Sequence, residues 1–285
     1  MRASVAFNRR ISNAYRHLGL RVPDFPAAFR PGQFVMLRPP WVGDPFLPRA
    51  FSIYRISVPS AALAPDGPAP TVEILYKMLG KGTQLLARME PGQPVDLLGP
   101  LGNSFTSPAG DELAILVAGG IGVPPIAALA AEILKSREPR AASRGAPAPK
   151  PQPPAPPIEV FLGGKTSEDI LCLKDFEEAG AKVQVTTEDG SLGARGLITD
   201  LLGPFLLLPS IPPLRMYTCG PPGMLAAVAH LAAERQVLCQ ASVEANMACG
   251  FGACMGCAVE VEGAARTYRL VCKDGPVFDS REIKW

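Results

Sequence analysis

Four cysteines near the end of the chain have the type and spacing of iron–sulfur ligands. Cys249, Cys254 and Cys257 lie within nine residues, and Cys272 follows a short segment of strand character. The spacing C-x4-C-x2-C…C is that of plant-type [2Fe–2S] sites, and thiolate sulfur selects iron–sulfur clusters or zinc. Structural zinc sites usually combine separated C-x2-C pairs or Cys with His. The pattern therefore favours a [2Fe–2S] cluster over zinc and over a disulfide framework.

Glycines dominate the loop between the first three cysteines. Gly250, Gly252 and Gly256 are predicted to adopt positive φ, which lets one tight loop wrap the cluster. In that conformation, backbone N–H groups turn toward the sulfurs and help to set the cluster potential. The remaining question is which groups exchange electrons with the cluster.

Two stretches in the first hundred residues have the chemistry of an anion site. The first is Arg49-Ala50-Phe51-Ser52, in which an arginine can pair with a pyrophosphate and Ser52 faces away from Arg49 and Phe51. In the second, a strand ends in glycines and a helix opens at Thr83, so that free N–H groups are available. Taken alone, each has a plainer interpretation, namely a solvated arginine and an N-capped turn. Their occurrence together favours a phosphate-bearing cofactor.

A strand followed by a glycine loop and a helix marks the middle of the chain. An apolar strand at 113–118 leads into Gly119-Gly120-Ile121-Gly122, and a helix from about Pro124 to Lys135 follows. This order opens a nucleotide-binding βα unit, although the full G-x-G-x-x-G is missing. Two later strand ends are also suggestive, namely Glu188-Asp189 and Cys219-Gly220-Pro221. Carboxylates at a strand end can bind ribose hydroxyls and repel a 2′-phosphate, which favours NAD; a solvated turn is the alternative.

These groups must be positioned by two different kinds of element. Short strands are predicted before residue 100, with one helix at 82–89, and later strands alternate with helices. The strands are expected at 4–7, 33–38, 51–58, 71–79, 94–98, 113–118, 158–162, 182–187, 215–219 and 240–244. Helices are expected at 124–135, 165–179, 197–202 and 222–235. The first group is typical of an antiparallel barrel and the second of a parallel sheet with ligands at its carboxyl edge.

The sequence therefore predicts a multi-domain protein. An antiparallel β-barrel is expected over 1–105, an α/β parallel-sheet nucleotide domain over 106–237, and a small cluster module over 238–285. The proline-rich segment 136–157 lacks large apolar residues and is predicted to be a disordered surface insertion. At 285 residues, the chain is long enough for about two domains or more.

Composition excludes several classes of function. The net charge of +2 gives no indication of nucleic acid binding. There is no apolar run long enough for a transmembrane helix, and the N-terminus lacks the apolar core of a signal peptide. Seven cysteines leave Cys172, Cys219 and Cys239 outside the predicted cluster. Free thiols together with a cluster fit the reducing cytoplasm.

Several of these motifs together resemble the ferredoxin–NADP reductase superfamily. Arg49-Ala50-Phe51-Ser52 resembles its R-x-[YF]-S flavin motif, and Gly82-Thr83 resembles the end of its G-x-G-T turn. The stretches at 118–125 and 217–224 resemble its A-G-G-x-G-x-x-P and Y-x-C-G-P-x-x-M nucleotide loops. With the appended cysteine module and the tail at 268–279, the chain resembles the electron-transfer subunits of NAD-dependent, B-type dihydroorotate dehydrogenases.

The resemblance implies roles for particular residues. FAD would be bound by Arg49, Ala50, Phe51, Ser52, Leu75, Tyr76, Lys77, Gly82 and Thr83. NAD, as a substrate, would lie against Gly119, Gly120, Gly122, Glu188, Asp189, Gly220 and Pro221, with Cys219 helping to position the nicotinamide. Cys249, Cys254, Cys257 and Cys272 would hold the [2Fe–2S] cluster.

The resemblance also implies a partner. A TIM-barrel subunit with FMN would oxidise dihydroorotate, and this chain would pass the electrons through the cluster and FAD to NAD in pyrimidine biosynthesis. A heterotetramer with two copies of each subunit is expected. One alternative keeps the cofactors but serves a transhydrogenase, sulfhydrogenase or sulfite reductase partner. An alternative of another class is a zinc-stabilised binding module or redox sensor.

Overall fold

The computed structural model describes residues 1–26, 29–40, 43–44, 46–58, 69–110, 112–135, 157–209, 212–263 and 267–285. The proline-rich segment predicted at 136–157 lies outside these residues except for Pro157. Within the described part of the chain, no helix is long and apolar enough to cross a membrane.

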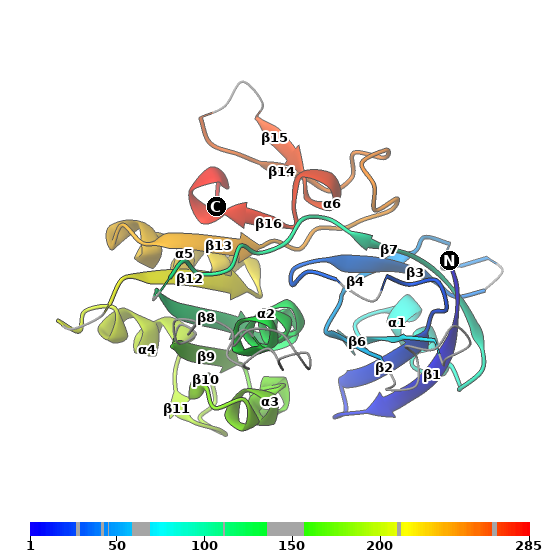
Figure 1. The fold of residues 1–285 in the computed structure, drawn as a ribbon, viewed down its shortest axis with the longest axis horizontal. Coiled ribbons are helices and arrows are strands. Elements are labelled where there is room, and N and C mark those ends of the chain that lie inside the picture. The colour runs from blue at the N-terminus through cyan, green and yellow to red at the C-terminus, as the bar shows by residue number, and fades with distance from the viewer. Residues whose placement is uncertain are drawn as a thin grey trace, which may run out of the picture.

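An antiparallel sheet, here called the N-terminal sheet, occupies the first hundred residues (Figure 1). Its described strands pair in the order β4-β3-β7-β1-β2-β6-β5. Their bounds are β1 Arg2–Arg10, β2 Tyr15–Arg21, β3 Phe34–Arg38, β4 Arg49–Ser52, β5 Arg55–Ser57, β6 Thr71–Lys77 and β7 Pro94–Leu101. One short helix, α1 Lys81–Leu86, follows β6.

The strand predicted at 51–58 is wrong, because the chain bends there and divides into β4 and β5 at opposite edges of the sheet. The N–H of Ile53 still donates to Gln33 on the β3 side, whereas that of Tyr54 donates to Glu73 on β6. Since two residues join the edge strands, the sheet has to curl until its edges approach each other. The strand β2 was not predicted.

A second sheet, the central sheet, has the described strand order β11-β10-β9-β8-β12-β13-β16. Neighbouring strands are parallel except for the last pair. The bounds are β8 Leu113–Gly119, β9 Ile158–Gly164, β10 Lys182–Thr187, β11 Ala194–Arg195, β12 Leu214–Cys219, β13 Leu238–Ser242 and β16 Val277–Asp279. The strands predicted in this region therefore form, with one- or two-residue differences at their ends.

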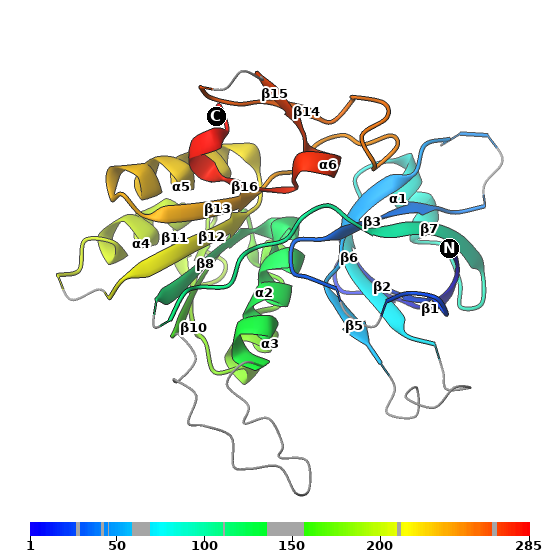
Figure 2. The same ribbon diagram turned by 45° about the horizontal axis from the view of Figure 1, so that its top comes forward.

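Helices cover both faces of the central sheet (Figures 1 and 2). α2 Val123–Lys135 and α3 Leu173–Glu178 pack on one face, and α4 Ile198–Phe205 and α5 Pro222–Glu234 pack on the other. Side chains of β8 alternate between these two cores, with Leu116 in one and Ile115 in the other. Burial on both faces explains why this strand is a continuous apolar run.

The single helix predicted at 165–179 is wrong. A 3-10 turn, η3 Ser167–Asp169, is capped by the Thr166 hydroxyl, and α3 begins only at Leu173. Between them, Cys172 has a left-handed φ of 59°, which ends any continuous helix. The break places Asp169 at the end of β9, where it contacts the N-terminal sheet.

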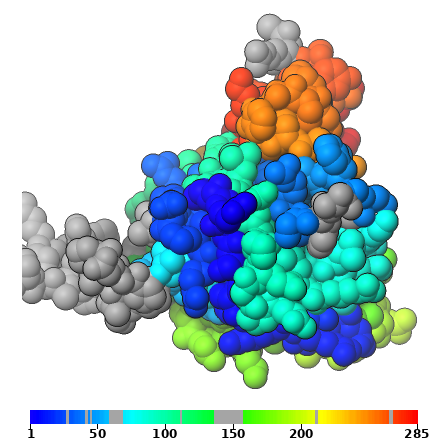
Figure 3. Space-filling view, turned by 90° about the vertical axis from the view of Figure 1, so that its right-hand side faces the viewer, coloured from blue at the N-terminus to red at the C-terminus, as the bar shows by residue number. Residues whose placement is uncertain are grey.

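The C-terminal residues pack beside the N-terminal sheet. They comprise a hairpin of β14 Ala258–Glu260 and β15 Tyr268–Leu270, then α6 Val271–Asp274, β16 and the 3-10 turn η4 Ser280–Glu282. Their core includes Cys257 and Cys272 together with Phe34 and Met36 of β3. Figure 3 shows these residues projecting above the N-terminal sheet.

Candidate functional site

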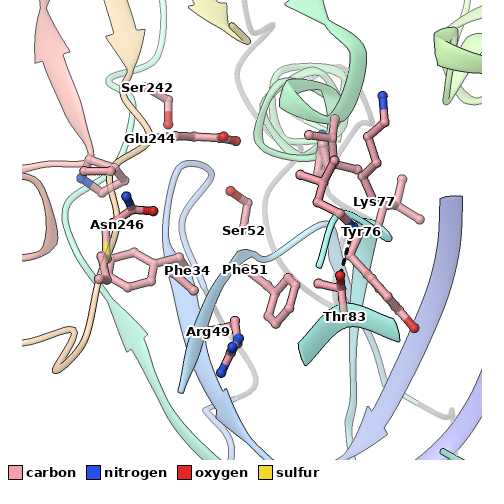
Figure 4. A pocket seen from close by; sticks show the side chains of 18 of the residues that line it. Phe34, Arg49, Phe51, Ser52, Tyr76, Lys77, Thr83, Ser242, Glu244 and Asn246 are labelled. Atoms are coloured by element: carbon pink, nitrogen blue, oxygen red, sulfur yellow. Dashed lines mark hydrogen bonds between the residues drawn. The ribbon is translucent and has the colours of Figure 1, made fainter. Parts of the chain in front are cut away.

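A cavity of about 530 Å³, here called the flavin cavity, gathers the predicted FAD residues. Arg49, Ala50, Phe51, Ser52, Leu75, Tyr76, Lys77 and Thr83 all line it (Figure 4). The far wall comes from the segment 242–247 that follows β13. The strands β4 and β6 therefore face a segment that leads directly to the cysteines.

Gly82 lies beneath the side chain of Arg49 rather than on the cavity wall. A Cβ at this position would approach the Arg49 Nε to 2.4 Å. The guanidinium can extend along the cavity only because residue 82 has no side chain. Beside it, the Thr83 hydroxyl oxygen accepts hydrogen bonds from the N–H groups of Leu79 (2.9 Å) and Gly80 (3.2 Å). These bonds hold the turn beside the Arg49 guanidinium, whose charge and donors suit a pyrophosphate, so the residues fit FAD.

A second cavity of about 490 Å³, the nucleotide cavity, lies at the carboxyl edge of the central sheet. Its lining includes Gly119, Gly120, Gly122, Glu188, Gly220 and Pro221. The two glycine loops touch here, since a Cβ on Gly122 would lie 2.4 Å from the Cys219 carbonyl oxygen. This position matches the expected ligand site of a parallel sheet.

Two residues predicted for the nucleotide site lie outside its described lining. The Asp189 carboxylate binds the N–H (2.9 Å) and hydroxyl (2.6 Å) of Ser191. Cys219 is 1% exposed, and burial raises the pKa of its thiol. Its role in positioning the nicotinamide stays a prediction, and a thiol in this state is a poor nucleophile.

Four residues line both cavities, and sequence reasoning assigned only one of them. The shared residues are Lys77, Leu79, Ile121 and Glu244. Glu244 projects into the space above Ser52 (Figure 4), and desolvation by the surrounding protein raises its pKa. The sequence around Glu244 does not predict this position, because the cavity forms only when β4, β6 and the segment 242–247 come together.

Lys77 is anchored where the two cavities join. Its ammonium lies 3.1 Å from Asp169 Oδ1 and over the ring of Tyr15, whose hydroxyl donates to the same carboxylate. Hydrogen bonds from Tyr15 and Lys77 outweigh burial and lower the pKa of Asp169, and burial with the Asp169 contact raises the pKa of Tyr15 to about 12. The network joins β2 and β6 to η3, the turn that follows β9.

The four predicted cluster ligands form one sulfur–sulfur contact and one contact through a backbone N–H. Cys257 Sγ and Cys272 Sγ are 3.2 Å apart and buried. The N–H of Cys254 donates to Cys249 Sγ at 3.4 Å, and further N–H donors outweigh desolvation and lower the pKa of Cys249 to about 6. Conversely, burial and the Cys257 sulfur raise the pKa of Cys272 to about 12.

The chemistry of this donor set suits an iron–sulfur cluster. A [2Fe–2S] cluster divides four thiolates between two irons, so the four cysteines fit it. The loop prediction needs one correction: Gly250 and Gly252 have positive φ, but Met255 takes this conformation in place of Gly256.

Comparisons with known proteins agree with this geometry. A family model for the iron–sulfur cluster binding domain of dihydroorotate dehydrogenase B matches residues 244–284, and one for an oxidoreductase NAD-binding domain matches 116–230. The electron transfer subunit of dihydroorotate dehydrogenase B (NAD(+)) from Desulforamulus reducens is 32% identical, covering 96% of this chain and 93% of its own. The subunit of the same name from Bacillus caldolyticus is 37% identical, over 89% of this chain and 86% of its own length.

A solved structure shares the fold at lower identity. It is that of an NADH-dependent reduced ferredoxin–NADP oxidoreductase, with a TM-score of 0.75 and 24% identity over 99% of this chain and 90% of that one. The likeness defines the fold, which is of the ferredoxin–NADP reductase type. Within that class, the chain belongs to the family of electron transfer subunits of dihydroorotate dehydrogenase B (NAD(+)). It is an NAD-linked oxidoreductase subunit whose cofactors are FAD and an iron–sulfur cluster.

Proposed function

We propose that this chain carries electrons from the FMN of a dihydroorotate-oxidising partner through a [2Fe–2S] cluster and FAD to NAD, in the synthesis of UMP. Oxidation of dihydroorotate to orotate releases two electrons and two protons, and NAD⁺ takes up both electrons with one proton. When bound, a flavin can exchange single electrons with iron–sulfur centres and a hydride with a nicotinamide. The partner is expected to be a TIM barrel, assembled with this chain as a heterotetramer of two plus two.

One observation carries this proposal: the flavin cavity has neighbours suited to both kinds of exchange. On one side it shares Lys77, Leu79, Ile121 and Glu244 with the nucleotide cavity. On the other side, its wall at Asn246 and Met247 is only two residues from Cys249. This arrangement supports a flavin that lies between a nicotinamide and the cysteines.

The cluster loop, residues 249–257, supports entry of electrons from outside the chain. Cys254 is exposed, and the apolar side chains of Phe251 and Met255 beside it are 59% and 62% exposed. Exposed apolar side chains around a redox site are typical of a docking surface for another protein. We assign the FMN subunit to this surface.

The finer structural predictions belong to the same proposal. A closed barrel over 1–105 is supported by the two-residue link between its edge strands. A cluster module over 238–285 is supported by the contact between Cys257 and Cys272. The predicted boundary at 237, however, would divide the central sheet, because β13 pairs with β12. A cytoplasmic location remains our expectation from the free thiols.

The test is anaerobic reconstitution of the chain with and without an FMN-containing dihydroorotate dehydrogenase subunit. We expect NADH to form from dihydroorotate and NAD only when both subunits are present. NADH formation by the isolated chain would contradict the division of labour. A chain that holds FAD and iron but fails with this partner would indicate the alternative transhydrogenase, sulfhydrogenase or sulfite reductase partner. Zinc without flavin would overturn the electron-transfer proposal.

A further inference from the structure

Asn103 makes an unusual set of contacts for a residue in a connecting segment. It follows β7 on the link to β8, and that link runs beside α6 and β16 (Figures 1 and 2). Its Nδ2 donates to the carbonyl oxygens of Asp274 (3.1 Å) and Val277 (2.8 Å), and its Oδ1 accepts the Val277 N–H (2.9 Å). Its own N–H donates to the Gly275 carbonyl at 2.7 Å. One residue thus holds the turn between α6 and β16.

That turn connects a cysteine ligand to the flavin cavity. Asp274 ends the helix that contains Cys272, and its carboxylate accepts the Leu270 N–H at 2.8 Å. Two residues further on, the Pro276 carbonyl accepts the Val243 N–H at 2.9 Å. Both Pro276 and Val243 line the flavin cavity. A shift of this turn would therefore move Cys272 and the cavity wall relative to each other.

Close packing leaves the turn little room to move. Gly102 has a φ of +76°, and a Cβ there would lie 2.5 Å from Pro276 Cδ. On the other side of the cysteine core, a Cβ on Gly250 would lie 2.5 Å from Met36 Cγ. Approaches this close between separate segments tolerate displacement poorly, because protein interiors are close-packed.

We infer that Asn103 is a positioning residue that fixes the Cys272 side of the iron–sulfur site relative to the flavin cavity. It thereby sets the geometry across which electrons pass between the two cofactors. This inference rests on the proposed function, since it assigns one determinant of that electron path. The described side-chain hydrogen bonds of Asn103 reach Asp274 and Val277, and its N–H reaches Gly275, so it acts through the turn at 274–277.

The test uses Asn103→Asp in the full chain with both cofactors bound. This substitution keeps the side-chain size but removes the Nδ2 donor and places a carboxylate against two carbonyl oxygens. The matched control is Asn8→Asp, because Asn8 Nδ2 likewise donates to two carbonyls, those of Leu86 (2.9 Å) and Met89 (3.1 Å). Asn8 Oδ1 accepts from the Tyr76 hydroxyl (3.3 Å), so this control acts on the flavin side and leaves the turn at 274–277 unchanged. Asn103→Ala serves as an uncharged second variant.

The measurement is rapid mixing of the isolated chain with NADH under anaerobic conditions. Flavin absorbance falls first, and the iron–sulfur absorbance follows in a second phase. For Asn103→Asp and Asn103→Ala we expect the second phase to slow by about tenfold, on the scale that small misplacements produce, while the first phase is unchanged. The electron paramagnetic resonance spectrum of the reduced cluster should shift in the same variants and not in Asn8→Asp.

The result that overturns the inference is an unchanged second phase and spectrum in both Asn103 variants. Parallel loss of iron and flavin, with normal kinetics in the protein that retains them, would also overturn it by showing a general folding role. Because neither the partner subunit nor dihydroorotate enters this experiment, failure of the proposed partner would appear separately, in the reconstitution assay.

Discussion

The N-terminal sheet has two neighbours and meets them in different ways. Toward the cysteines, its Phe34 and Met36 belong to the same apolar core as Cys257 and Cys272, and the described contact includes no ion pair. Toward the central sheet, Tyr15, Tyr54 and Leu75 enter the core, but their surroundings are charged: Lys77 pairs with Asp169 at 3.1 Å and Arg55 with Asp175 at 3.8 Å. The nucleotide cavity lies on this second, charged side, and the flavin cavity lies between the two contacts, with Phe34 and Val243 of the cysteine core in its lining.

The two contacts differ because one holds cofactors that stay bound, whereas the other must admit and release a nucleotide. A cluster and a flavin stay with the protein, so the contact between their sites can be close-packed and permanent. A nicotinamide nucleotide must enter and leave between the two sheets. Partly exposed ion pairs contribute little net free energy and are easily exchanged with solvent or with an anionic ligand. The charged contact is therefore the one suited to small movements during turnover.

The largest expected effect is at the permanent contact. Cys257→Ala removes a buried ligand, and we expect loss of essentially all cluster iron, since four thiolates are needed. Visible absorbance and iron analysis of anaerobically purified protein provide the measurement. The control is Cys239→Ala, at a cysteine that is equally buried in another core and should retain full iron. Equal iron loss in both variants would point to general destabilisation.

Binding of FAD tests the other resident cofactor. Gly82→Ala places a methyl group against the Arg49 guanidinium, and we expect FAD affinity to fall about tenfold, or roughly 1.4 kcal/mol. Gly80→Ala is the matched control, because a Cβ there meets nothing within 4 Å. Alanine favours the helix interior at position 82, whereas Gly80 is the N-cap, where alanine is less favourable than glycine. A decrease in FAD affinity confined to position 82 must therefore come from Arg49. Equilibrium titration of the apoprotein with FAD gives the measurement, and equal affinities in the two variants would refute it.

Local structure around the predicted site residues could be anticipated because it depends on short spacings in the sequence. The cysteine pattern, the strand that precedes Gly119 and the R-x-F-S motif at Arg49 each occupy one continuous segment. The residues at 49–52 and 119–122 line the cavities, because strand alternation and loop length decide the direction of a side chain locally. The same reasoning explains why the antiparallel and parallel sheets were anticipated.

The contacts between the sheets could not be predicted in this way. Tyr15 lies on β2, whose polar His17 and small Gly19 disguise the strand pattern, and Asp169 lay within a helix that the structure breaks at Cys172. Glu244 reaches the cavities only because β13 ends there. Each depends on contacts between segments more than 60 residues apart, for which a single sequence carries no periodic signal.

The charged contact is tested by Asp169→Asn. We expect a higher KM for NADH, with FAD and iron content unchanged, and a loss of stability of about 1 kcal/mol or less because the ion pair is partly exposed. Asp175→Asn is the control within the same interface, since it lies outside both described cavity linings and should leave KM unchanged. Equal KM values for Asp169→Asn and the parent protein would show that the pair does not affect the nucleotide site.

The same network predicts how stability depends on pH. The pKa of Asp169 is lowered from 3.8, so its contribution is present above that value and is lost as pH falls through the folded-state pKa. The pKa of Tyr15 is raised from 10.0 to about 12, so its contribution is present below pH 10 and is lost as pH rises toward 12. Thermal unfolding can be measured as a function of pH in these two ranges. The dependence of stability on pH should be weaker in Asp169→Asn than in the parent protein. Parallel curves for the two proteins would contradict the assignment.

The smallest expected effect concerns the choice between NAD and NADP. Glu188 lines the nucleotide cavity, whereas Asp189 is turned to Ser191, so only the first carboxylate is placed to repel a 2′-phosphate. Glu188→Gln should raise kcat/KM for NADPH relative to NADH by several-fold, about 1 kcal/mol, because Lys165 in the same lining already offsets part of the repulsion. Asp189→Asn is the matched control and should change the ratio less. A larger change at Asp189 would mean that the loop rearranges when the nucleotide binds, and the charged side of the molecule would then be more mobile than its ion pairs alone indicate.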